Sequence, residues 1–433
     1  MRDIFLIVFL FGSVPFILRR PTYGVMLWVW VSVMNPHRLA WGPAYDMPFA
    51  MVIAATTVVG AVFSREPKQI PFNGITIVLL LLTIWMSVTT IFALNPDPAV
   101  DTWIRVTKTM FMVFVTIYLL HSKKHVYVLV CILAASIAYY GIKGGVFTLV
   151  GGGESKVWGP EGSYIEENNA LAVATIMTIP LLRYIQMHAS NRWLKIGLLG
   201  AMILCGFSAL GSHSRGALIA ILATLLFLWI KGQNKVRGGL VLLLLVPVGI
   251  AFMPDSWTQR MQTIETYEQD ASAMGRINAW KMAMNLAQDR IVFGGGFQIY
   301  EKEIFARYAP VPDDVHAAHS IYFAMLGEHG FIGLGLFLLL WILVWRNASW
   351  IDKHARSRED LIWAADLARM IQVSVLGYLV GGGLLSLAYY DVPYYLAAAL
   401  VVTRALVERE LQPATARGRA GSVMPAARAK AMQ

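Results

Sequence analysis

The chain has 433 residues, of which 57% are hydrophobic and only 14% are charged, and its mean hydropathy is +0.57. A soluble protein of this length carries charge on about a quarter of its residues, so the composition excludes an ordinary soluble enzyme. The net charge of +10 could suggest nucleic-acid binding. However, the lysines and arginines fall mainly in short connections between apolar runs and in the tail, as in membrane proteins. We therefore predict an integral membrane protein with no nucleic-acid partner.

Thirteen apolar runs follow one another along the chain, many of them close to the roughly 20 residues that span a bilayer. They cover residues 4–18, 23–34, 47–63, 74–94, 104–120, 125–141, 168–184, 194–211, 216–231, 238–253, 320–345, 367–389 and 392–406. The first two are short and could form one tilted or re-entrant pair. Arg19 and Arg20 follow the first run instead of a small-residue cleavage site, so we expect this run to be retained. The sequence predicts an all-α polytopic membrane protein with about twelve transmembrane helices.

Basic residues occupy every second connection, and the positive-inside rule assigns these connections to the cytoplasm. The alternate connections then face outward: 35–46, 95–103, the glycine-rich 142–167, 212–215, 254–319 and the one around Asp391. The expected organisation is therefore transmembrane helices with short loops in 1–253, a large helical outer loop in 254–319 and further transmembrane helices in 320–407. The tail 408–433 is expected to be cytoplasmic and disordered.

The outer loop contains one helix-like stretch, residues 276–290, with apolar residues at helical spacing. Such an amphipathic helix would lie on the membrane or cap the bundle, and it could be no more than a lid. Arg276 and Arg290, at its ends, are about 21 Å apart along a helix, too far to hold one small anion together. Arg276 would sit at the N-terminus, where free N–H groups also favour an anion. Arg290 would sit at the C-terminus, where a cation is stabilising in any case.

Two polar segments mark the outer ends of inward-running helices. Residues 211–216 read Gly-Ser-His-Ser-Arg-Gly, and Arg215 could bind a phosphate beside the helix N-terminus or could extend to lipid headgroups. His316 and His319 precede the run that begins at residue 320. A histidine there can be a general base or a purely structural residue. Two histidines three residues apart also allow a metal ligand pair, although no further ligands follow at a recognisable spacing.

Three further residues are candidates for substrate contact. Glu328 lies about 13 Å beyond His319 along a helix, at a depth where a carboxylate normally has a partner or a function. Tyr322 lies on the first turn of that helix. Asn169, next to Asn168, opens another inward-running helix, a position that capping alone would also explain.

Taken together, these segments resemble the O-antigen ligase and polymerase superfamily of bacterial inner-membrane glycosyltransferases. The matching pieces are Asn168-Asn169-Ala170, Ser214-Arg215-Gly216, Gly275-Arg276 with Trp280, Gly294-Gly295-Gly296-Phe297, His319-Ser320-Ile321-Tyr322 and Leu326-Gly327-Glu328-His329-Gly330. The chain is most similar to the lipopolysaccharide O-antigen ligase branch. This resemblance implies transfer of a glycan from undecaprenyl diphosphate to the lipid A–core oligosaccharide, at a site on the periplasmic face.

The resemblance and the chemistry of this transfer suggest a role for each candidate residue. His319 is the expected base, Arg215 and Arg276 clamp the diphosphate, and no metal or other cofactor is expected. The expected substrate-binding residues are Arg215, Arg276, Arg290, His316, Tyr322, Asn169 and Glu328. The alternatives within the superfamily are a polysaccharide polymerase and a protein O-glycan ligase. A transporter of lipid-linked glycans is the alternative from another class. A transporter would need several charged residues deep in its spans, whereas this chain shows one deep charge and a large outer loop, which favour an enzyme.

Overall fold

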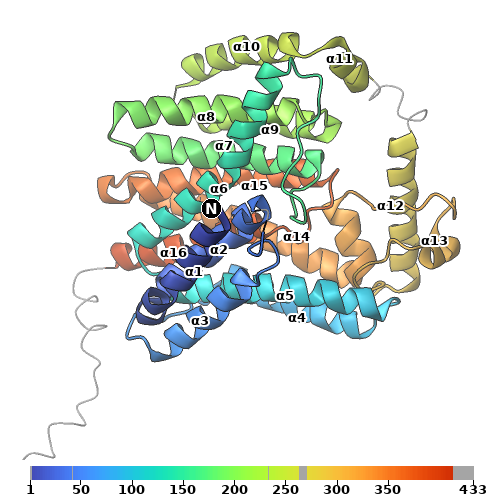
Figure 1. The fold of residues 1–433 in the computed structure, drawn as a ribbon, viewed down its shortest axis with the longest axis horizontal. Coiled ribbons are helices and arrows are strands. Elements are labelled where there is room, and N and C mark those ends of the chain that lie inside the picture. Colours follow the sequence, from blue (N-terminus) through green and yellow to red (C-terminus); the bar gives the residue numbers. More distant parts are fainter. Residues whose placement is uncertain (1, 41, 233, 263–270, 413–433) are drawn as a thin grey trace, which may run out of the picture.

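The computed structural model describes residues 2–40, 42–232, 234–262 and 271–412, and all regular structure in these ranges is helical (Figure 1). Each of the thirteen apolar runs forms a helix. Those in the N-terminal half are α1 (Arg2–Arg19), α2 (Pro21–Met34), α3 (Phe49–Phe63), α4 (Gly74–Ile91), α5 (Pro96–Leu119), α6 (Lys123–Val150) and α7 (Asn168–His188). Those that follow are α8 (Arg192–Leu210), α9 (Arg215–Lys231), α10 (Lys235–Phe252), α14 (Ile321–Ala355), α15 (Ile362–Gly382) and α16 (Asp391–Leu411). The first two runs are thus separate helices that meet at Arg20.

Five further helices occupy the connections of the described chain. They are the 3-10 helices η1 (Pro36–Leu39) and η3 (Glu359–Leu361), and α11 (Asp255–Gln262), α12 (Ala271–Asp289) and α13 (Lys302–Tyr308). Side chains accept a backbone N–H at the start of several helices and so fix where these begin. The capping residues are Asn73, Ser122, Asn191, Ser214 and Ser320.

Within the described residues, five helices are long and apolar enough to cross a membrane, or six if α10 and α11 form one bent span. The five are α4, α6, α7, α8 and α14. The expected number of twelve is not confirmed. Helices α2 and α3 have only 14 and 15 residues, short of the roughly 20 that a span needs. Helix α5 carries acidic and basic residues in its first half. These features support a multi-pass membrane protein, and they leave the number of spans open.

The glycine-rich connection 142–167 begins later than its composition suggested, because α6 continues to Val150. Gly145 explains the extension. A Cβ there would lie 2.1 Å from the backbone oxygen of Leu204 in α8, and one at Gly144 would lie 2.4 Å from the Ser208 hydroxyl. These glycines therefore allow two helices to pack closely, and they do not form a flexible loop.

Helix α7 lies at the centre of the bundle. In its most apolar stretch 89% of the residues are buried, compared with 22% in the same kind of stretch in α8. It packs on α6, α8, α9 and α15, and α15 also packs on α14. Helix α16 is buried over most of its length and extends to Leu411. The first residues of the expected tail 408–433 are therefore helical, and its remainder from 413 lies outside the described residues.

The connections expected to face outward lie together at one end of the bundle. The backbone N–H of Leu94 donates to Gly295 O at 2.8 Å, and His213 Nε2 lies 2.7 Å from Gly153 O. Helix α12 runs crosswise to the bundle helices at this end (Figure 1). We call it the α12 end.

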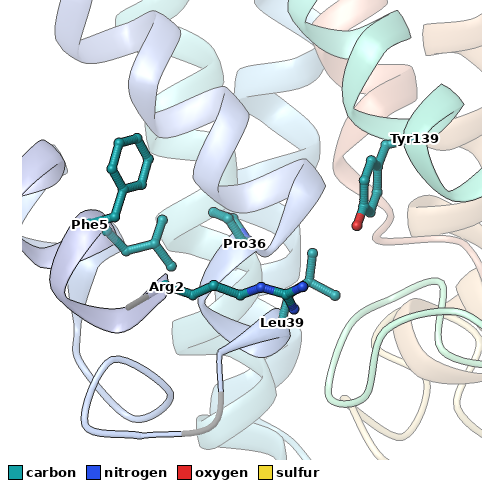
Figure 2. Close-up of a pocket in the computed structure, with 6 residues that line it drawn as sticks. Arg2, Phe5, Pro36, Leu39 and Tyr139 are labelled. Atoms are coloured by element: carbon teal, nitrogen blue, oxygen red, sulfur yellow. The ribbon is translucent and has the colours of Figure 1, made fainter.

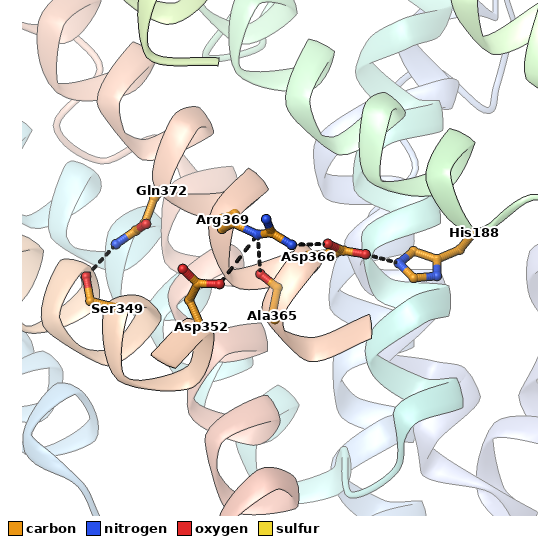
Figure 3. A network of polar contacts seen from close by, with 7 residues as sticks. All are labelled: His188, Ser349, Asp352, Ala365, Asp366, Arg369 and Gln372. Atoms are coloured by element: carbon orange, nitrogen blue, oxygen red, sulfur yellow. Dashed lines mark hydrogen bonds and ion pairs between the residues drawn. The ribbon is translucent and has the colours of Figure 1, made fainter. Parts of the chain in front are cut away.

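A polar network ties three helices together at the opposite end (Figure 3). His188 of α7 lies 3.2 Å from Asp366 of α15, and the same carboxylate pairs with Arg369. Arg369 also lies 3.5 Å from Asp352 of α14. Since Asp366 is buried, this network fixes the far ends of α7, α14 and α15 to one another.

Candidate functional site

Helix α12 holds the segment that leads into His319. The Asn278 side chain donates to Val311 O at 2.8 Å and to Asp314 O at 3.0 Å, and it accepts the Val311 N–H at 3.0 Å. Trp280 donates from Nε1 to Ala318 O at 2.6 Å. Trp280 also stacks on Phe323 of α14, with ring centroids 5.1 Å apart. The predicted helix therefore does more than cover the bundle, because it holds the backbone before the histidine and a side chain on the first turn of α14 after it.

His319 has an unusual backbone conformation at the entrance to α14. Its φ is +43°, in the left-handed region, which costs energy for a residue with a side chain and is concentrated at functional sites. The next residue, Ser320, caps α14. Nδ1 of His319 is buried and has no hydrogen-bond partner among the residues that the structure describes. An unsatisfied buried nitrogen of this kind is available to a ligand.

Burial and the nearby charges together favour the neutral form of His319. Burial lowers the pKa of His319 below its ordinary value, and the positive charge of Arg276 lowers this pKa further. The carboxylate of Glu167, just before α7, acts in the opposite direction and raises the pKa. His319 therefore lies within electrostatic reach of both α12 and the start of α7. A neutral imidazole is the form that can accept a proton.

Arg276 lies within α12 and not at its beginning. The helix is already formed at Ala271, so the N–H of Arg276 lies beyond the four orphan donors of a helix start. The expectation that Arg276 uses a helix terminus to bind an anion is therefore wrong, and its guanidinium has to act by its own charge. His316 packs on Gly275, the residue before Arg276, because a Cβ at Gly275 would lie 2.7 Å from His316 Nδ1. The same nitrogen pairs with Asp314 at 2.8 Å.

Three helix starts gather around the C-terminal part of α15. Asn168, at the start of α7, donates from Nδ2 to Ser212 O at 2.6 Å, just before α9. A Cβ at Gly216 of α9 would lie 3.1 Å from Leu384, and one at Gly382 would lie 2.8 Å from Ile321 of α14. The starts of α7, α9 and α14 are thereby brought together, with the N–H groups of their first turns at the α12 end.

Several other predicted residues lie at these helix starts. Arg215 is the first residue of α9, and Asn169 is the half-buried second residue of α7. Tyr322, on the first turn of α14, donates its hydroxyl to Leu379 O at 2.9 Å. Arg290 lies elsewhere, at the far end of α12, where it donates to Phe92 O at 2.6 Å.

Glu328 belongs to a buried hydrogen-bonded chain that sequence reasoning did not find. The hydroxyl of Tyr389 donates to Glu328 Oε2. Because this hydroxyl has a single hydrogen, its oxygen has to accept from His329 Nε2, 2.8 Å away. His329 Nδ1 lies 2.7 Å from Thr89 Oγ1. Tyr389 precedes α16 by two residues, so only the folded chain brings it to Glu328.

The same region joins the glycine-rich segment 294–296 to a break in α14. The N–H of Gly295 donates to Gly327 O and that of Gly296 to Glu328 O, both at 2.8 Å. Gly330 interrupts the helix with φ +68° and ψ −171°. The Gln298 N–H donates to Glu328 Oε1 at 3.2 Å. Glu328 thus accepts a hydrogen bond from the outer-loop backbone on Oε1 and one from the Tyr389 hydroxyl on Oε2.

In the part of the chain that the structure describes, no three His, Cys, Asp or Glu side chains are grouped as a metal site would require. The site is instead built from imidazole, guanidinium and amide groups at helix starts. Such groups can bind an anion and move a proton.

These features define a polytopic helical membrane protein whose polar site lies where a crosswise helix covers several helix starts. Residues 200–338 match the family described as "O-Antigen ligase", and residues 1–190 match a "Family of unknown function (DUF5935)". No curated protein matches the chain. The first match supports the O-antigen ligase and polymerase superfamily of membrane glycosyltransferase-like enzymes, without selecting a ligase. It contains every predicted site residue except Asn169, whereas Tyr389 lies outside both matched segments.

Proposed function

We propose that the protein is an O-antigen ligase that transfers a glycan from undecaprenyl diphosphate to the lipid A–core oligosaccharide. The reaction would take place on the periplasmic face of the bacterial inner membrane, at the α12 end of the bundle. One observation carries the proposal. His319 has a buried nitrogen with no partner among the described residues, and its pKa is lowered in a site that contains Arg276. The match of residues 200–338 to the ligase family gives independent support.

In the proposed reaction the acceptor hydroxyl attacks the anomeric carbon of the donor glycan while His319 takes the hydroxyl proton. The bond from the anomeric carbon to the diphosphate oxygen breaks, and its electron pair leaves with the diphosphate. A single displacement of this kind inverts the anomeric carbon. Arg215 and Arg276 stabilise the charge that develops on the leaving group. These guanidinium groups take the role that a metal ion has in other transferases.

The remaining predicted residues have different parts in this proposal. Asn169 and His316, near the helix starts and α12, are assigned to contacts with the donor, as is Tyr322. Arg290 and Glu328 have polar partners on Phe92 and Tyr389. These contacts favour a role in positioning the loop over direct contact with substrate.

The test is transfer in vitro with purified full-length protein, a defined undecaprenyl-diphosphate glycan and lipid A–core. His319→Ala and Arg215→Ala should each lower the rate about 100- to 1000-fold, the usual cost of one electrostatic donor or base. His354→Ala is the control, because this exposed histidine lies at the opposite end of α14. Near-normal transfer by His319→Ala would refute the assignment.

The same assay separates the superfamily's activities. A ligase adds one glycan to lipid A–core and leaves the donor alone when the acceptor is absent. Extension of the lipid-linked donor without acceptor would identify a polymerase instead. Movement of the donor across vesicles with no glycan transfer would identify a transporter.

A further inference from the structure

A cavity away from the candidate site lies between the N-terminal helix and α6. It has a volume of about 460 Å³ and is lined by Arg2, Phe5, Leu6, Pro36, Leu39 and Tyr139 (Figure 2). None of these residues belongs to the candidate site. The volume lies in the range of about 300–1,000 Å³ that is usual for sites that bind small molecules.

One side of the cavity carries a cation that the protein does not neutralise. Among the described residues, Arg2 has no hydrogen-bond or ion-pair partner, and Figure 2 shows its side chain extending past Pro36 toward Leu39. The adjacent carboxylate is turned to the loop after η1, where Asp3 Oδ1 accepts the N–H groups of Gly42 and Ala44 at 3.0 and 3.3 Å. The guanidinium is thus left facing an otherwise apolar cavity.

A second cation lies on α6, one helical turn beyond Tyr139, which lines the cavity. Lys143 is exposed on α6 four residues beyond Tyr139, and residues four apart share a helix face. Within the described chain Lys143 also has no polar partner. Two basic side chains beside an apolar cavity are complementary to a ligand with an anionic head and an apolar chain.

The cavity adjoins an exposed apolar face of α1. Phe5 is 69% exposed and Val8 is 65% exposed, although both are apolar. An exposed apolar helix face of this kind is expected where a membrane protein contacts the acyl chains of the bilayer. A ligand can therefore enter sideways from the membrane, with its head beside Arg2.

We infer that this cavity binds an anionic phospholipid of the surrounding bilayer, with its phosphate between Arg2 and Lys143 and an acyl chain against Phe5, Leu39 and Tyr139. A free phosphate would leave the apolar walls empty. A zwitterionic lipid would bring a positive group close to the two cations. The site is independent of glycan transfer, and it lies near the α12 end because Arg38 of η1 borders Gly162, in the connection that leads into α7.

Native mass spectrometry of the full-length, lipid-depleted protein tests this inference by comparing phosphatidylglycerol with phosphatidylethanolamine. We expect phosphatidylglycerol to bind at least fivefold more tightly. Arg2→Gln should weaken its binding about fivefold, as expected for one basic residue beside an anionic lipid, and Arg2→Gln with Lys143→Gln should abolish the preference. Arg20→Gln, an exposed arginine at the other end of α1, should change nothing.

Thermal unfolding provides a second measurement, since a ligand that binds only the folded state raises the melting temperature. Phosphatidylglycerol should raise it most in the wild type and less in Arg2→Gln, and in the double variant it should raise it no more than phosphatidylethanolamine does. Equal binding of both phospholipids, or unchanged binding in Arg2→Gln, would overturn the inference. Displacement of phosphatidylglycerol by undecaprenyl phosphate at equal concentration would also overturn it, because the cavity would then belong to the donor lipid. Since no outcome depends on transferase activity, failure here leaves the proposed function untouched.

Discussion

The hydroxyl of Tyr389 donates a hydrogen bond to the buried carboxylate of Glu328 across 61 residues of sequence. Burial, followed by the charge of Glu328, raises the pKa of Tyr389 well above its ordinary value. The phenol therefore keeps its proton and remains a donor. Through Glu328 this bond reaches the Gln298 N–H and so the beginning of the segment that ends at His319.

Tyr389→Phe should destabilise the protein by about 1–3 kcal/mol, because it leaves a buried acceptor without its donor. We also expect a lower kcat with a smaller change in KM, since the loop that carries His319 loses a support. Thermal unfolding and transfer kinetics measure the two effects. Tyr378→Phe is the matched control, because it removes one neutral hydrogen bond to Leu387 O from a buried tyrosine. Equal effects of the two substitutions would contradict a special role for Tyr389.

Gly330→Ala should cost about 1–3 kcal/mol of stability, because alanine resists the φ of +68° at this position. Its Cβ would also lie 2.4 Å from Val292 O. Gly335→Ala, five residues further along α14, is the control, since a Cβ there meets nothing within 4 Å. This control should be neutral or stabilising by up to about 1 kcal/mol. The measurement is the melting temperature of each variant, and equal melting temperatures would contradict the expected strain at position 330.

The pH dependence of transfer should report the charges around His319. Because the pKa of His319 is lowered, the neutral base persists below the ordinary value of about 6.5, and activity should fall only at more acidic pH. Arg276→Gln removes a charge that lowers this pKa, so the acid limb should move to higher pH. Glu167→Gln removes a charge that raises it, so the limb should move to lower pH.

The pH at which log(kcat/KM) begins to fall gives the apparent pKa of the base in each variant, independently of the maximal rate of that variant. Shifts in the same direction for both substitutions would exclude His319 as the titrating base.

Chelation with EDTA should leave transfer unchanged if Arg215 and Arg276 supply the positive charge at the leaving group. The assay compares rates before and after chelation. Loss of activity that a divalent ion restores would require a metal in the reaction.

The sequence predicted the helices well and the contacts between distant helices poorly. All thirteen apolar runs are helical, since hydrophobic runs bounded by polar caps depend on local chemistry. The segment just before one connection expected on the outer side meets another such connection, since Leu94 donates to Gly295 O. Which side of the membrane this end faces is still a prediction.

Other features depend on tertiary structure. The helix containing Arg276 begins at least five residues earlier than its apolar pattern suggested, because small residues such as Ala271 and Ala273 carry little periodic signal. Gly144 and Gly145 resembled a loop, yet they allow α6 to pack against α8. Tyr389 could not be recognised in advance, because no local pattern links it to Glu328.

The network of His188, Asp366, Arg369 and Asp352 constrains how the site can admit its substrates. It joins α7, α14 and α15 by ion pairs at the end away from His319, whereas the starts of α7 and α14, where the site lies, are held by single hydrogen bonds from Asn168 and Tyr322. The three helices are therefore joined at one end by this network and can separate more easily at the other. Any widening to take in a lipid with a bulky glycan would be smallest at Asp366 and largest at His319, where the donor and acceptor have to meet.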